Sequence, residues 1–88
     1  MKVDEAAAAY REALKERTRD RAPLVWAGTE ENLAAAYCML SHMAGRPVLD
    51  DALEAIDGAL EEYRKAHSNT DIERAEDMRE WILSAKSK

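Results

Sequence analysis

The sequence predicts an all-α fold of four antiparallel helices that form a fragment of a helical repeat array. An internal repeat is the first observation: the segment that opens at Val3 returns at Leu49, an offset of 46 positions. Such a recurrence is typical of arrays in which one unit cannot bury its apolar face alone. Apolar residues also recur three and four positions apart, as on one face of a helix. No segment alternates apolar and polar residues over a useful length, so no strand is expected.

The first two helices are expected over residues 3–19 and 23–43. Pro23 suits the first turn of a helix and disfavours helical geometry in the residue before it. Gly45 and Pro47 are expected to end the second helix. The first apolar stripe comprises Val3, Ala6, Ala7, Tyr10, Ala13, Leu14 and Arg17, and the second is marked by Trp26, Leu33, Tyr37, Leu40 and Ala44.

The third and fourth helices are expected over residues 49–66 and 71–85. Gly58 interrupts the third, either because another helix crosses closely there or because the position is tolerated. Thr70 and Glu73 have the spacing of a capping box, which places the start of the fourth helix beside them. The third stripe comprises Leu49, Ala52, Leu53, Ile56, Ala59, Leu60 and Tyr63, and the fourth Ile72, Ala75, Met78, Ile82 and Ala85.

Composition and charge narrow the classes of function. The 88 residues allow one domain, residues 1–88, and carry a net charge of −5, which makes nucleic acid a poor default partner. No apolar run reaches the roughly 18 residues of a membrane span, and the acidic opening at Asp4 and Glu5 does not resemble a signal peptide. Cys38 is the single cysteine, so no intrachain disulfide is expected. We therefore expect a cytoplasmic protein that binds neither membrane nor nucleic acid.

Two short stretches resemble the tetratricopeptide repeat family. Residues 32–37 are similar to its first-helix signature, and residues 51–60 are similar to its second. The matching residues are Leu33, Ala34 and Tyr37 in the first stretch and Ala52, Ile56 and Ala59 in the second. The usual unit has about 34 residues, so the offset of 46 resembles a long-repeat bacterial variant. The resemblance implies a piece of a right-handed superhelix, with a C-terminal unit followed by a capping helix in which Arg79 replaces the signature leucine.

This resemblance implies a non-enzymatic scaffold for protein–protein interaction that binds a partner peptide or helix on the inner faces of its first helices. Self-assembly as a homodimer is the alternative. The candidate partner-binding residues are Glu30, Glu31, Ala35, Cys38 and His42. A carboxylate on this surface is expected to be solvated, so Glu31→Ala should leave stability unchanged within about 0.5 kcal/mol.

Three other groups of residues have alternative interpretations. Cys38 and His42 lie four positions apart and could form a nucleophile–base pair or half of a metal site. Neither a third ligand nor a glycine-rich turn lies nearby, so we expect no enzyme, no metal and no cofactor. Trp81 and Leu83 lie off the fourth stripe and form either an interface or a packing contact. The arginines at 17, 19 and 21 form either a solvated helix end or a basic patch.

Overall fold

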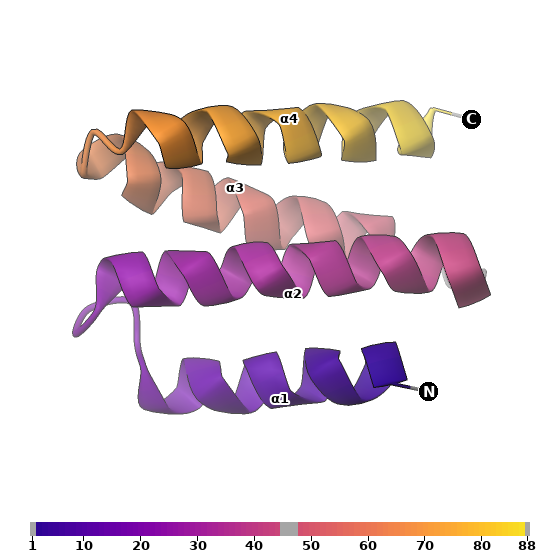
Figure 1. Cartoon of the computed structure of the whole chain (residues 1–88), viewed down its shortest axis with the longest axis horizontal. Coiled ribbons are helices and arrows are strands. Elements are labelled where there is room, and N and C mark those ends of the chain that lie inside the picture. The colour runs from indigo at the N-terminus through magenta and orange to yellow at the C-terminus, as the bar shows by residue number, and fades with distance from the viewer. Residues whose placement is uncertain (1, 45–47, 88) are drawn as a thin grey trace.

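The structure, a computed structural model, describes residues 2–44 and 48–87, and all the regular secondary structure in them is helical. The four helices are α1 (Lys2–Glu16), α2 (Pro23–Ala44), α3 (Leu49–Lys65) and α4 (Asn69–Lys86). No strand occurs within those two ranges, so the predicted all-α class is confirmed. The chain runs from right to left along α1 and α3 in Figure 1, and from left to right along α2 and α4.

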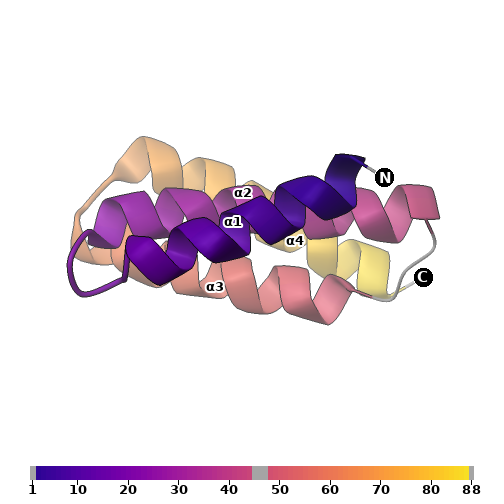
Figure 2. The same ribbon diagram turned by 90° about the horizontal axis from the view of Figure 1, so that it is seen from below.

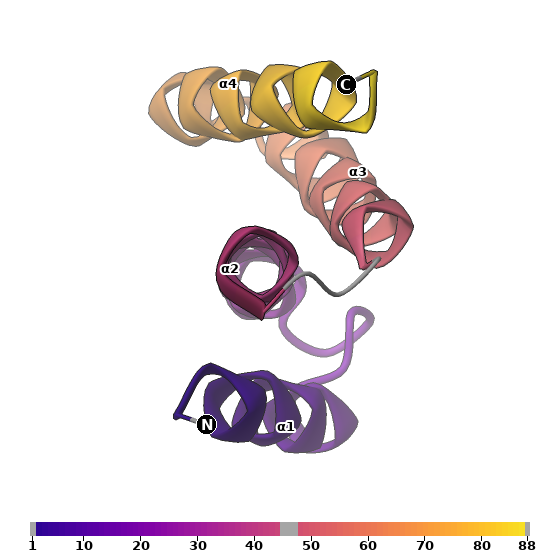
Figure 3. The ribbon, with the colours of Figure 1, turned by 90° about the vertical axis from the view of Figure 1, so that its right-hand side faces the viewer.

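The helices follow one another in space as they do in the sequence. α1 lies along α2 when seen from below (Figure 2) and packs against it. The end-on view shows α3 displaced to one side of the line through α2 and α4 (Figure 3). α4 packs mainly on α3 and has a smaller contact with α2. Apart from α1, which packs on α2, no helix in the described part of the chain covers the side of α2 and α4 that faces away from α3.

The first helix ends at Glu16, three residues earlier than expected. The reason is a long-range contact of Arg19, which the apolar spacing of the first helix does not reveal. Arg19 turns back toward α3, where its Nε donates to Glu62 Oε2 at 2.6 Å, and its guanidinium lies 4.5 Å from the ring centroid of Trp26 on α2. The middle residue of the arginine cluster is therefore part of the packing, whereas Arg17 and Arg21 are exposed.

The connection between α3 and α4 is a Schellman turn, a common way to satisfy the last carbonyls of a helix. His67 adopts the left-handed conformation, with φ of 56°, and Ser68 N donates to Tyr63 O at 3.0 Å. α4 then begins at Asn69, and Ser68 occupies the N-cap position. The predicted capping box at Thr70 and Glu73 is therefore wrong, because both residues already lie inside the helix. The expected stop at Gly45 and Pro47 lies outside the described residues.

The core is built from a few large side chains and many alanines. Ile56, Leu60 and Ile82 are the largest fully buried side chains, and Leu33 and Tyr37 are buried beside them. Several alanines have no exposed surface at all, namely Ala27, Ala34, Ala52, Ala59 and Ala75. Such small residues allow helix axes to approach closely.

Of the two interpretations of Gly58, the structure supports the close approach of another helix. A Cβ placed on Gly58 would lie 3.0 Å from the Cη2 atom of Trp26, which is tighter than ordinary van der Waals contact. The glycine thus leaves room for the Trp26 ring of α2 against α3. Glycine inside a helix costs about 1 kcal/mol relative to alanine, but an alanine here would crowd the Trp26 ring.

Candidate binding groove

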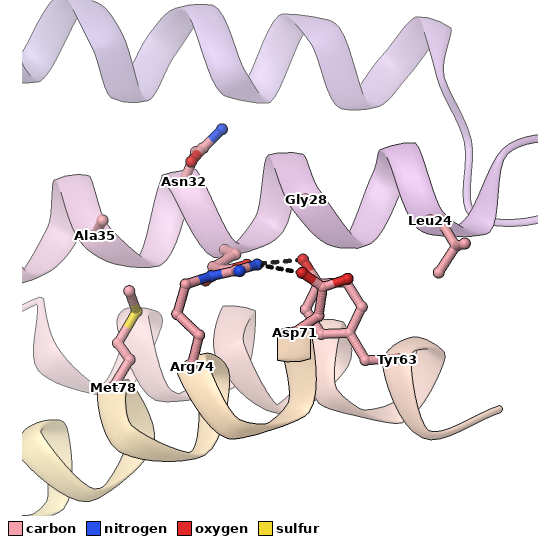
Figure 4. Close-up of a pocket in the computed structure, with 9 residues that line it drawn as sticks. Leu24, Gly28, Asn32, Ala35, Tyr63, Asp71, Arg74 and Met78 are labelled. Atoms are coloured by element: carbon pink, nitrogen blue, oxygen red, sulfur yellow. Dashed lines mark hydrogen bonds and ion pairs between the residues drawn. The ribbon is translucent and has the colours of Figure 1, made fainter. Parts of the chain in front are cut away.

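Two adjacent hollows lie between α2 and α4, and together we call them the groove. The first has a volume of about 480 Å³ and the second about 500 Å³. They share Ala35 of α2 and Met78 of α4 in their walls. The first, which we call the polar end, is drawn in Figure 4, where the labelled Met78 and Arg74 side chains rise from α4 toward α2. The second is the apolar end.

The polar end is held together by a buried carboxylate. Glu31 on α2 is only 7% exposed. Arg74 of α4 donates to it from Nε at 2.5 Å and from Nη2 at 2.8 Å. Tyr63 of α3 donates its hydroxyl to the same carboxylate at 2.7 Å. Glu31 therefore joins three helices through charge-assisted hydrogen bonds, which are stronger than neutral ones.

This network shifts the ionisation of its members in the directions expected for a buried ion pair. The Arg74 hydrogen bonds hold the pKa of Glu31 below its ordinary value of 4.5, although burial acts in the opposite direction. Burial and the hydrogen bond to Glu31 raise the pKa of Tyr63. Asp71, one turn before Arg74 on α4, also accepts from Arg74 Nη2 at 2.6 Å. The carboxylates are therefore ionised at neutral pH and Tyr63 remains a donor.

The expectation that Glu31 lies on a solvated surface is wrong. Its side chain is buried and has three hydrogen bonds to partners on α3 and α4. A buried carboxylate that accepts from an arginine and a tyrosine has a structural role, so Glu31→Ala is expected to lower stability rather than to be neutral.

The apolar end is made of soft, partly exposed side chains. Met39 and His42 on α2 are exposed, as is Trp81 on α4, with Met39 and Trp81 each 48% accessible. Cys38 and Met78 are half-buried between them. Apart from His42 and Asp77, the lining of this hollow is apolar or carries sulfur. Methionines adapt their shape to different neighbours, as in surfaces that accept several ligands.

Three of the five candidate residues meet at this apolar end, namely Ala35, Cys38 and His42. Glu30 does not join them. It lines a separate hollow between α2 and α3 together with Glu54, and burial, followed by the charge of Glu54, raises its pKa. One step along a helix rotates a side chain by about 100°, so neighbours such as Glu30 and Glu31 lie on different faces.

Trp81 and Leu83 likewise lie on two different surfaces of the protein. Trp81 lines the apolar end, whereas Leu83 lines a hollow on the other side of α4 with Arg64 and Glu76. The sequence did not identify Met39, Met78 or Arg74 as members of the groove. The sequence signal for the two methionines is weak, because a methionine at helical spacing is more often a core residue than a binding residue.

Cys38 lacks the features of an activated thiol. Burial raises the pKa of the Cys38 thiol, which keeps it protonated at neutral pH. A protonated thiol is a poor nucleophile and a poor metal ligand. Among the residues that the structure describes, no three His, Cys, Asp or Glu side chains cluster where they could hold a metal ion.

None of the helices within residues 2–44 and 48–87 has the length and apolar character that crossing a bilayer requires. Comparison of the chain with protein-family models, with curated proteins and with solved structures finds no match.

Proposed function

We propose that this chain is a non-enzymatic interaction module, a tetratricopeptide-like scaffold of antiparallel helices that binds a peptide or helix of a partner protein in the groove. The first support is the register of the helices. α2 begins at Pro23 and α4 at Asn69, which are 46 positions apart, the same offset at which Val3 and Leu49 recur. On this proposal α2 and α4 are first helices of successive units, α4 serves as the cap, and the chain is a fragment of a right-handed superhelix.

Equivalent positions of α2 and α4 line the groove. Asn32 and Met78 are 46 positions apart, as are Ala35 and Trp81, and all four contribute to its walls. Repeat scaffolds expose an extended concave surface formed by corresponding elements of successive units. On this proposal, the groove is part of that concave surface.

The observation that carries the proposal is the exposed apolar lining of the groove. Met39 and Trp81 are each 48% accessible around a hollow of about 500 Å³. Burying such side chains against a partner stabilises a complex, and large apolar residues at a concave site are frequent anchors of binding. A helix fits this shape, because an amphipathic helix places its apolar face in a groove through side chains three and four positions apart.

A displayed library of helical peptides, selected against the wild-type chain, tests the proposal. The affinity of each selected peptide is then measured for Met39→Glu, which places a charge in the apolar end. Leu83→Glu is the matched control, since it places the same charge on the other side of α4. We expect Met39→Glu to weaken binding by about tenfold or more and Leu83→Glu to leave it unchanged. Equal affinity for both variants would show that the ligands bind elsewhere.

Self-assembly is the second candidate function, and the exposed side chains at the start of α2 favour it. Leu24 is 49% accessible and Val25 is 47% accessible. Two copies could bury this surface together with the groove. Sedimentation equilibrium over a wide range of concentration distinguishes the two: a dimer that Met39→Glu dissociates favours self-assembly, whereas a monomer favours a separate partner. We further propose that the partner is a protein rather than nucleic acid or membrane, because the chain carries a net charge of −5.

A further inference from the structure

A row of acidic side chains, which we call the acidic stripe, lies on α4 between the apolar end of the groove and the hollow that Leu83 lines. Glu73, Asp77 and Glu80 follow at intervals of four and three positions, so they lie along one side of the helix. All three are exposed. Asp77 lines the apolar end as well as the hollow on the other side of α4, whereas Glu73 and Glu80 line only that second hollow, beside Arg64 and Arg79. Within residues 2–44 and 48–87 none of the three has an ion-pair partner, whereas their neighbour Glu76 pairs with Arg64 at 3.1 Å. The stripe is therefore a row of carboxylates without ion pairs among the described residues, and it meets the apolar end of the groove at Asp77.

The opposite wall of the groove adds no positive charge that would neutralise this stripe. On α2 the lining consists of neutral side chains apart from His42 and Glu31. The guanidinium that lines the groove itself, that of Arg74, is bound by Glu31 and Asp71. A ligand that complements the groove must therefore present an apolar face and, next to it, positive charge.

We propose that the groove binds a basic amphipathic helix, with apolar anchors against Met39, Met78 and Trp81 and lysine or arginine side chains along the acidic stripe. This inference rests on the proposed function and specifies its partner. Leu24 and His42 mark the two ends of the groove on α2, and the helix axis between them measures about 27 Å at 1.5 Å per residue. A bound helix of about 18 residues, or five turns, matches that length.

A second copy of the chain does not have this chemistry. Two copies that meet through the groove in a symmetric dimer would bring their acidic stripes together, and like charges oppose such a contact. Cations that could compensate, including Arg64, Arg79 and Lys86, are held by carboxylates of their own chain. An anionic membrane surface is disfavoured for the same reason, because the stripe repels it.

Three synthetic 18-residue peptides test the inference by isothermal titration calorimetry. The first carries a leucine and methionine stripe flanked by lysines, the second replaces every lysine with glutamate, and the third has the composition of the first in scrambled order. We expect the first to bind about tenfold or more tightly than either of the others, and to weaken several-fold between 50 and 200 mM salt.

Charge reversal shows whether the stripe itself is responsible. We expect Asp77→Lys combined with Glu80→Lys to weaken binding of the lysine peptide by about tenfold. The matched control is Glu5→Lys combined with Glu16→Lys, two exposed positions of α1 that change the net charge equally; it should retain most of the affinity. Circular dichroism of both double variants verifies that the helices remain folded.

The possible outcomes separate this inference from the proposed function. If the lysine and glutamate peptides bind equally and Met39→Glu weakens both, the groove is a docking site without charge preference and the inference is overturned. If no peptide binds and the chain is monomeric, the proposed function fails as well. A lysine peptide that loses equal affinity in both double variants, a dimer that covers the groove, or binding of the chain to anionic vesicles would each overturn the inference.

Discussion

Replacing Glu31 with alanine tests whether the buried carboxylate holds α2, α3 and α4 together. The change removes three hydrogen bonds, at 2.5, 2.7 and 2.8 Å. Tyr63, only 3% exposed, would lose the acceptor of its hydroxyl, and an unsatisfied buried donor costs about 1–3 kcal/mol. The side chain of Arg74 is 51% exposed and keeps Asp71, so its loss is reduced by solvent to less than about 1 kcal/mol.

Together these effects predict that Glu31→Ala lowers the free energy of unfolding by about 1–4 kcal/mol. Urea denaturation followed by circular dichroism at neutral pH measures this difference. Asp57→Ala is the matched control, because Asp57 also pairs with an arginine of α4, at 2.6 Å, but its side chain is 46% exposed; its cost should stay below about 0.5 kcal/mol. If the two variants lose the same small amount, the carboxylate does not have the structural role assigned to it.

The acid dependence of the same network has a definite sign. The pKa of Glu31 is lower in the folded chain than its ordinary value of 4.5, so ionised Glu31 favours folding. This stabilisation is complete above the unfolded pKa and is lost as the pH falls through the folded pKa. Glu31→Gln should therefore differ most from wild type at neutral pH and least in acid. A difference that does not change with pH would contradict the assigned ion pair.

The remaining predictions concern the core, the α3–α4 turn, the thiol and the second carboxylate. Leu33→Ala and Ile56→Ala should each cost about 2–5 kcal/mol in urea denaturation, because both side chains are buried; normal unfolding of both would contradict the core assignment. His67→Gly should raise stability by about 0.5–1 kcal/mol, since His67 has a φ of 56° that glycine adopts without strain, and a loss would show that its side chain has a stabilising contact. Cys38 should react with a thiol probe at neutral pH more slowly than free cysteine, because burial raises the pKa of its thiol; fast labelling would reopen the enzymatic interpretation. Glu30→Gln should raise stability at neutral pH by up to about 0.5 kcal/mol, because burial and Glu54 raise the pKa of Glu30 and the ionised form therefore disfavours folding. That gain should disappear as the pH falls and Glu30 becomes protonated, and a gain that persists in acid would contradict it.

The sequence predicted the elements well because their signal is local. Apolar residues spaced three and four positions apart identified all four helices and the buried positions Leu33 and Ile56, and Pro23 marked the start of the second helix. The end of α1 was missed because Arg19 leaves the helix to reach Glu62, which is 43 positions away. No local pattern contains such a contact.

The groove was predicted only in part, for the same physical reason. Ala35, Cys38 and His42 lie together because they share a face of one helix. Glu31 was assigned to the surface because glutamate is usually exposed, whereas its partners lie 32 and 43 positions away on other helices. Pairing across helices depends on their packing angle and register, which a single amphipathic pattern does not specify.

The alanines of the core have a consequence for how this protein tolerates change. Ala34, Ala52, Ala59 and Ala75 are completely enclosed, so an added methyl or isopropyl group there has no space and must push two helix axes apart. In a library containing every single substitution, these small residues should reject enlargement as strongly as Ile56 rejects truncation. The sites most restrictive toward variation are thus among the smallest side chains in the chain, and a survey that follows side-chain size alone would overlook them.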